Sequence, residues 1–320
     1  MSQVLHVVMY HYVRYLPNTS FPRIKGMLTS DFRRQLAALR NRYEIATLES
    51  ALDFLQGTYT PSRDLCLLTF DDGLKEHYAE VTPLLVDSHI QGVFFVITSC
   101  LENQHVAPVH MKHFLMAALD FEFYQPAFLQ RLNQLAPWLR ISTAVDAAVA
   151  QRAYRWDTPE VASFKYLFNF VLDWTIRDEV ARSLFAENIS DEKSFASTLY
   201  LSWEEARQMQ SAGMLIGGHS HQHIPLTALP YEGLHSDLTT CQRLLLRHLQ
   251  PQSFWPFCYP YGKKNSFNDS AVGELKQLEF ACSFSTVAGT NIPGTDLFTI
   301  RRIDCKDVSS ELCAEAAGMS

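Results

Sequence analysis

Short apolar runs that alternate with amphipathic stretches constrain the fold of this chain more than any other feature. Residues 65–70 (LCLLTF) and 92–98 (GVFFVIT) are two such runs, and the stretch 75–87 between them has helical spacing. A run of this kind is typical of a strand buried on both faces. Strand–helix–strand alternation over so short a distance indicates parallel strands joined by crossover helices. The sequence therefore predicts an α/β fold.

The same alternation extends to both ends of the chain. Further strands are predicted at 4–10, 214–219, 255–262, 280–286 and 297–304, and further helices at 31–43, 48–56, 203–211, 231–249 and 269–278. Ser30 is expected to cap the first of these helices. Ser202 and Glu205 are expected to form a capping box at the start of helix 203–211. Polar motifs follow several of the strands, which is where a closed α/β barrel or an open doubly wound sheet carries its site.

A long segment at about 102–200 breaks this alternation. Strand-like runs are absent from its sequence, which is rich in Ala, Leu, Phe and Gln at helical spacing. We expect a helical insertion within a single domain that spans residues 1–320. The insertion could cover a substrate groove or form a dimer contact, so a homo-oligomer is one expected state.

Charge and composition exclude several classes of function. The 320 residues include 27 Lys and Arg against 34 Asp and Glu, a net charge of −7. A general binder of nucleic acid or of anionic membranes needs a basic face, which this composition does not favour. No segment approaches the roughly 20 apolar residues of a membrane span. The N-terminus lacks the features of a secretion signal, and the seven cysteines form no CxxC pair, so a cytoplasmic enzyme with free thiols is predicted.

Two adjacent carboxylates follow the strand predicted at 65–70. Asp71 and Asp72 lie in the sequence Thr-Phe-Asp-Asp-Gly, at the point where the strand passes into a loop. Both side chains can reach one cavity there, so that one can bind a metal ion while the other stays free as a base. An Asp-Asp-Gly turn without chemistry is the alternative, because such turns are common.

Two imidazoles follow the strand predicted at 214–219. His219 and His223 are spaced i, i+4, which suits two ligands of one metal ion, and Gly217-Gly218 is expected to let the backbone turn sharply before them. His221, between them, is expected to be directed elsewhere. A surface histidine cluster is the alternative. Together with the two aspartates, the pair forms the ligand set of a divalent metal site with a spare carboxylate.

Two further residues lie at predicted strand ends. His11 directly follows the first strand, and Tyr261 lies in the turn Tyr-Pro-Tyr-Gly at 259–262. The backbone N–H of Tyr261 could face a developing oxyanion. Taken alone, His11 would be an ordinary residue at the rim of the fold, and the sequence Tyr-Pro-Tyr-Gly would be an ordinary turn without a functional role.

In combination, these motifs match a known family. The order Thr-Phe-Asp-Asp-Gly (69–73), His-Ser-x-x-His (219–223) and Tyr-Pro-Tyr-Gly (259–262) resembles the polysaccharide deacetylases, the NodB-type carbohydrate esterases of family 4. The resemblance covers about residues 1–100 and 200–304. The helical insertion lies outside the general pattern.

The resemblance implies a fold, a cofactor and residue roles. The fold would be a distorted (β/α)7 barrel. Asp72, His219 and His223 would be the ligands of a divalent metal ion, with zinc the first choice. Asp71 would be the base that activates water, and the backbone N–H of Tyr261 would be the donor to the tetrahedral oxyanion.

The chain departs from the family pattern at two places. Many members have an arginine in the third motif that braces the catalytic aspartate, and this chain has Cys258 there. Arg301 or Arg302 on the last strand could replace it; only one can face the site because side chains alternate along a strand, and Arg302 is favoured. The usual late Leu-x-His motif, which carries the catalytic acid, is missing. In a permuted subgroup resembling the biofilm poly-N-acetylglucosamine deacetylases, that acid lies in a Tyr-His pair on the first strand, which Tyr10-His11 fits.

The residues and the resemblance predict a metal-dependent hydrolase that removes an N-acetyl group from an amino sugar or glycan precursor. An N-deacylase or cyclic-amide hydrolase for a small non-carbohydrate molecule is an alternative, and so is a non-catalytic carbohydrate-binding protein. Two histidines and one carboxylate also describe non-haem iron oxygenases. Their His-x-Asp pair would be His235-Ser236-Asp237, although that segment has the spacing of the middle of an amphipathic helix.

Overall fold

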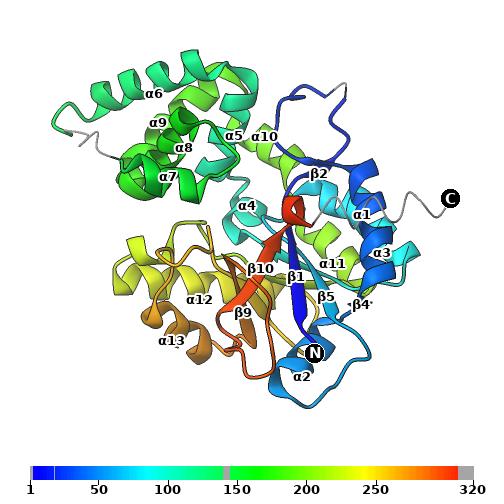
Figure 1. Ribbon diagram of the computed structural model, residues 1–320. Helices are drawn as coiled ribbons and strands as arrows, with labels where there is room; N and C mark the ends of the chain where they lie inside the picture. The colour runs from blue at the N-terminus through cyan, green and yellow to red at the C-terminus, as the bar shows by residue number, and fades with distance from the viewer. Residues whose placement is uncertain (1–2, 18, 140–144, 309–320) are drawn as a thin grey trace. The chain divides into compact units, whose positions relative to one another are not determined.

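A closed barrel of parallel strands is the framework of the protein, whose computed structural model describes residues 3–17, 19–139 and 145–308. In hydrogen-bonded order the strands are β1 (Leu5–Tyr10), β10 (Ile300–Asp304), β9 (Cys282–Ala288), β8 (Pro256–Cys258), β7 (Leu215–Gly218), β6 (Gly92–Val96) and β5 (Leu65–Phe70). Pairing of β1 with β5 closes the ring. Within the described residues this is the seven-stranded parallel barrel that the family resemblance implied. Figure 1 labels β1, β5, β9 and β10 among its strands. The short strand β4 (Glu44–Ile45) also pairs with β5.

The strands β1 and β5 end level with one another. Their parallel register places Tyr10 beside Phe70. The residues that follow, His11 after β1 and Asp71 and Asp72 after β5, therefore leave the barrel at the same end. In α/β barrels this carboxyl end of the strands is the one that carries the active site.

Apolar side chains fill the space around these strands. Every residue of β5 and β6 is buried. One core cluster joins barrel strands to the helix α2 (Leu48–Gln56); its members include Leu5, Val7, Leu52, Leu55, Leu65, Leu67, Val93, Phe95, Phe284 and Ile300. Burying a side chain of this size contributes about 1.5–3 kcal/mol, so this packing holds the strand ends in fixed positions.

The helices around the barrel are α1 (Thr29–Arg42), α2, α3 (Thr82–Asp87), α4 (Thr98–Asn103), α11 (Trp203–Ser211), α12 (Tyr231–His248) and α13 (Asp269–Gln277). All except α3 and α4 agree with the predicted ranges within a few residues, and α4 was not predicted. The predicted capping box of Ser202 and Glu205 is present. The predicted cap by Ser30 is wrong, because α1 begins at Thr29 after Leu28. Leu28 belongs to a short strand, β3 (Met27–Leu28), which pairs with β2 (Val13–Arg14) and leads directly into the helix.

The helix predicted at 75–87 is also different. A π-helical turn, His77–Val81, precedes α3. Pro83 has no N–H to donate to the preceding turn, and the N–H of Thr82 instead donates to the carbonyl of His77, five residues back. Similarly, the strand predicted at 92–98 ends at Val96, and Thr98 already belongs to α4.

The chain divides into two compact units, and the second contains most of the predicted insertion. It comprises Leu16–Lys25 and Val106–Ala196. Its helices are α5 (Pro108–Ala118), α6 (Phe121–Leu135), α7 (Ala147–Ala153), α8 (Pro159–Tyr166), a π-turn at Leu167–Val171, α9 (Trp174–Asn188) and the first part of α10 (Glu192–Leu199). The described residues between α4 and α11 include no strand, as the sequence predicted.

Aromatic and cationic side chains form the interior of this second unit. The rings of Phe128 and Phe164 lie 5.4 Å apart. The buried cations of Lys112 and Arg177 lie over the ring of Phe168, at 4.8 and 5.2 Å from its centroid, an arrangement that stabilises buried positive charge. Among the helices of the described ranges, none combines the length and the apolarity that crossing a membrane would require.

Candidate active site

Three buried side chains converge at the carboxyl end of the barrel. The Nε2 atoms of His219 and His223 lie 3.5 and 3.6 Å from Oδ1 of Asp72, and all three residues are at least nine-tenths buried. Two ligand atoms that share a tetrahedral cation at about 2.0–2.2 Å lie roughly 3.4 Å from each other. The three residues therefore form a group that could hold a metal ion, and their spacing fits one better than direct hydrogen bonds.

The backbone around this group is strained. Asp72, Ser220 and His223 all have positive φ, at 79°, 61° and 56°. Residues with a Cβ rarely adopt this region, and each such residue costs of order 1 kcal/mol or more. Strain of this kind persists where the surrounding structure enforces it, and such residues cluster at functional sites.

Gly217 and Gly218 serve a different purpose from the one predicted. Both lie in the extended strand β7, and neither has positive φ. A Cβ on Gly217 would lie 2.3 Å from the carbonyl oxygen of Pro256, and one on Gly218 would lie 2.9 Å from Sγ of Cys241. The glycines thus allow close approach of β8 and α12 to β7; the sharp turn comes after them, at Ser220 and His223.

One imidazole has its tautomer fixed by the barrel. Nδ1 of His219 lies 2.7 Å from the carbonyl oxygen of Cys258. Because a carbonyl only accepts, Nδ1 carries the hydrogen and donates it, and Nε2 is the nitrogen that faces Asp72 and would bind a metal ion. A histidine that donates one ring N–H to the protein while offering the other nitrogen is the usual state of a metal ligand.

The loop between the two histidines is held by Asp237, which the sequence analysis considered only as part of an iron-oxygenase pair. The backbone N–H groups of His221 and Gln222 both donate to the carboxylate of Asp237 at 2.9 Å. Burial raises the pKa of Asp237 to about 6, while these two hydrogen bonds act in the opposite direction. The ring of His221 turns toward the hydroxyl of Thr98, at 3.0 Å, so it is directed away from the triad as predicted.

The spare carboxylate has a buried cationic partner. Nη1 and Nη2 of Arg302 donate to Oδ1 and Oδ2 of Asp71 at 2.8 and 2.7 Å. Burial alone would raise the pKa of Asp71, but the guanidinium outweighs it and the pKa is lowered. The side chain of Arg302 faces the site, as the sequence analysis favoured, while Arg301 is exposed.

A second group of possible metal ligands shares the same space. Asp71, His219 and Cys258 also lie close enough to hold an ion. However, Nη2 of Arg302 lies 3.0 Å from Sγ of Cys258, and the guanidinium of Arg302 already donates a hydrogen bond to each oxygen of Asp71. Because a metal ion there would compete with the guanidinium of Arg302 for the same carboxylate and be repelled by it, the triad with Asp72 is the metal site that the geometry favours.

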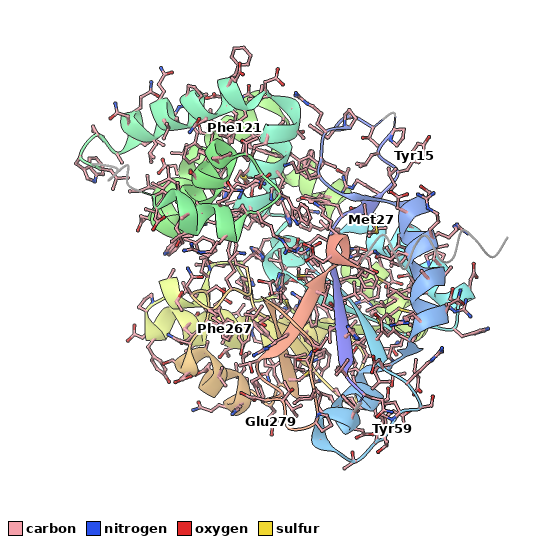
Figure 2. All side chains as sticks on the ribbon, viewed as in Figure 1. Tyr15, Met27, Tyr59, Phe121, Phe267 and Glu279 are labelled. Carbon is pink, nitrogen blue, oxygen red and sulfur yellow. The ribbon has the colours of Figure 1, made fainter. Side chains whose placement is uncertain are left out.

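The two remaining predicted residues lie beside these same side chains. Nε2 of His11 lies 3.7 Å from Oδ2 of Asp71, and the side chain of His11 is 43% exposed. The ring of Tyr261 lies 5.0 Å from that of His223, and Tyr261 has a positive φ of 62°. Phe267, labelled in Figure 2, stacks on the ring of Tyr259 at 3.9 Å and so supports the turn at 259–262.

The residues proposed for an iron oxygenase do not meet. Nδ1 of His235 pairs with Glu274 on α13, and its side chain is more than half exposed. Asp237, two residues on, is buried beneath the 219–223 loop. A helix directs residues i and i+2 to different faces, which is the physical reason that this pair cannot share an ion.

More than half of the chain matches one family model. The model describes polysaccharide deacetylases, and it matches residues 58–134 and 168–283. The chain therefore belongs to the polysaccharide deacetylase family. The match extends into the segment 102–200, which the motifs alone placed outside the family pattern, and it begins only after the first barrel strand. No curated protein matches the chain at a significant level.

Solved structures with the same fold include several bacterial deacetylases. Deacetylase PplD of Streptococcus pyogenes, in complex with acetate, gives a TM-score of 0.60 at 14% identity over 99% of each chain. IcaB from Ammonifex degensii gives 0.59 at 19% identity over 99% of this chain and 98% of that one. A de-N-acetylase from Aggregatibacter actinomycetemcomitans gives 0.59 at 15% identity over 98% and 100%. At such identities the similarity shows the fold.

Proposed function

We propose that this protein is a metal-dependent deacetylase that hydrolyses the N-acetyl group of an amino sugar or glycan precursor. The observation that carries the proposal is the triad of Asp72, His219 and His223 beside the separate Asp71–Arg302 pair. This is a cation site with a carboxylate next to it that is held by another partner. A divalent ion, with zinc the first choice, would be held by the triad, and it acts when bound as a Lewis acid toward water and a carbonyl oxygen.

Asp71 is the proposed general base. The fork of Arg302 occupies both of its oxygens and favours the ionised form. An ionised carboxylate at neutral pH can accept a proton from an attacking water. The same two hydrogen bonds keep the carboxylate in one orientation, so that it does not swing toward the triad and become a ligand.

His11 is the proposed general acid, and Tyr261 the proposed oxyanion donor. An amine leaves poorly unless it is protonated, and an imidazole near neutral pH suits that task. His11 is close to Asp71 yet partly exposed, so that an incoming sugar can reach it. A single backbone donor such as the N–H of Tyr261 is worth about 3–4 kcal/mol to a developing oxyanion.

The names of the structural relatives support the proposal that this protein removes acetyl groups. One is a deacetylase in complex with acetate and another is a de-N-acetylase; we extend their chemical class to this chain as part of the proposal. A cytoplasmic location would favour a nucleotide- or lipid-linked sugar precursor over a finished polymer. That location, zinc as the metal and a homo-oligomer stay predictions. A small-molecule N-deacylase is the competing candidate.

Metal-dependent acetate release tests the proposal. The metal-free protein should be inactive, and one equivalent of zinc should restore acetate release from one or more members of a panel of N-acetylated amino sugars, chitooligosaccharides and nucleotide sugars. Asp72→Asn is the matched control, because it replaces the anionic ligand of the triad with a neutral amide and should neither retain zinc nor turn over. Stoichiometric zinc binding without acetate release from any sugar, but with release from simple N-acyl amines, would favour the competing candidate.

A further inference from the structure

The chain after β1 is anchored by three successive carbonyl groups. The carbonyl of Tyr10 accepts from the N–H of Asp71 at 2.9 Å, which is the last bond of the β1–β5 ladder, and the carbonyl of Tyr12 accepts from the N–H of Met27 at 2.9 Å. Met27 is labelled in Figure 2. Between them, the carbonyl of His11 lies beyond the ladder and needs a different donor.

That donor is the imidazole of His77. Its Nε2 lies 2.8 Å from the carbonyl oxygen of His11. Because the carbonyl can only accept, Nε2 carries the hydrogen. His77 is fully buried, and burial lowers its pKa to about 4, against the opposing effect of the bond to His11. The ring is therefore neutral and keeps this tautomer at neutral pH.

The position of His77 is fixed from several sides. Its ring lies 5.7 Å from that of Phe70 and 5.6 Å from that of Phe94, on the two adjacent strands β5 and β6. Its own carbonyl accepts both the N–H and the hydroxyl of Thr82, the latter at 2.7 Å. These bonds define the π-turn, and π-turns recur at functional sites.

A purely structural role does not account for a histidine here. Among the described residues, Nδ1 of His77 has no hydrogen-bond partner. A buried polar atom without a partner costs about 1–3 kcal/mol, and a phenylalanine would pack against the two neighbouring rings without this cost. What the histidine adds is the single bond from Nε2 to the backbone of His11.

We infer that His77 is a positioning residue that fixes the backbone of His11 and thereby holds its imidazole beside Asp71, where the leaving nitrogen is protonated. The inference rests on the proposed function, in which His11 is the general acid. The anchored carbonyl belongs to the same residue as the imidazole, so a shift of this backbone moves the ring directly. A misplacement of about 1 Å can cost up to 100-fold in rate.

Two substitutions separate this role from simple packing. His77→Phe keeps an aromatic ring and removes the donor, while His77→Gln keeps a donor at about the same reach. For the zinc-loaded protein we expect His77→Phe to lower kcat for an N-acetylated sugar by about 10- to 100-fold with little change in KM. His77→Gln should recover part of that loss. Tyr78→Phe is the matched control, since it removes a hydrogen bond from the same π-turn, to Gln208, and should leave kcat unchanged.

A substrate that needs no general acid gives the decisive comparison. A nitrophenyl acetate releases a stable phenolate without protonation, so its hydrolysis by His77→Phe should match that of the wild type. Equal loss on both substrates, or no loss on the amide, would overturn the inference.

Crystal structures of the wild type and His77→Phe provide a readout that needs no activity. The separation of 3.7 Å between Nε2 of His11 and Oδ2 of Asp71 should increase in the variant, and an unchanged separation overturns the inference. A wild type that hydrolyses neither substrate would instead count against the proposed function, and the crystal structures would still decide the role of His77.

Discussion

The guanidinium of Arg302 and the carboxylate of Asp71 form a fork of two parallel hydrogen bonds, 2.8 and 2.7 Å long, between residues 231 positions apart in the chain. Both side chains are buried. Arg302 also donates to the carbonyl of Ser285 at 2.8 Å and contacts the hydroxyl of Thr69 at 3.2 Å. The last strand of the barrel thus fixes the orientation of a carboxylate that follows a strand from the first third of the chain.

Removal of Arg302 should therefore destabilise the fold as well as the site. Arg302→Met leaves the buried carboxylate of Asp71 without its partner, and breaking a buried ion pair in this way costs about 3–5 kcal/mol in free energy of unfolding. Urea denaturation followed by circular dichroism measures it. The double variant Asp71→Asn/Arg302→Met should regain part of the loss, because it no longer buries a lone charge.

The neighbouring arginine supplies the control for this experiment. Arg301 lies on the same strand with an exposed side chain, so Arg301→Met should change the free energy of unfolding by less than about 0.5 kcal/mol. Equal losses for the two arginine variants would contradict the assigned pair.

The two adjacent aspartates should respond differently to the same substitution. Asp71→Asn removes the proposed base but no ligand, so the protein should keep its metal at wild-type stoichiometry while kcat falls by about 100-fold or more. Asp72→Asn replaces an anionic ligand with a neutral amide and should lose the metal. Elemental analysis after dialysis, together with acetate release, distinguishes the two cases. Full activity of Asp71→Asn would reject the assignment of the base.

The acid role of His11 predicts a change in turnover more than in affinity. His11→Ala should lower kcat for an N-acetylated sugar by about 100-fold while KM stays within a few-fold of the wild type. Steady-state kinetics at saturating zinc measure both parameters. An effect confined to KM would assign His11 to substrate binding instead.

The parts of the site that could be predicted depend on local sequence. The buried runs that end at Asp71 and at His219 indicate strand ends, and parallel strands bring their carboxyl ends together whatever the details of packing. The alternation of side chains on the last strand limited the site to one of Arg301 and Arg302; Arg302 was favoured, and the structure has this orientation.

What could not be predicted depends on contacts between distant elements. No spacing rule connects Asp237, in the middle of α12, to the backbone of His221 and Gln222. The bond from His77 to His11 requires the π-turn, which replaced a predicted continuous helix. The predicted role of Gly217 in a sharp turn was wrong. The close approach of Pro256 to Gly217 is visible only once β7 and β8 are placed together.

The ionisation of the buried carboxyl group of Asp237 should be visible in how the free energy of unfolding depends on pH. Its folded pKa of about 6 exceeds the ordinary aspartate value of 3.8, with burial as the largest cause. A carboxyl group whose pKa is raised by folding favours the folded state when protonated. Its stabilising contribution is full below the unfolded pKa and is lost as the pH rises through about 6.

Asp237→Asn cannot ionise, so it removes this dependence. The free energy of unfolding of the wild type minus that of Asp237→Asn should therefore fall by about 2 kcal/mol between about pH 4 and pH 7. Urea unfolding of the metal-free proteins across that range measures the difference without interference from pH-dependent metal binding. Asp87→Asn, at an exposed position at the end of α3, is the control and should follow the wild type at every pH. A difference that stays constant or grows with pH would show that the two N–H donors, rather than burial, determine the charge of Asp237.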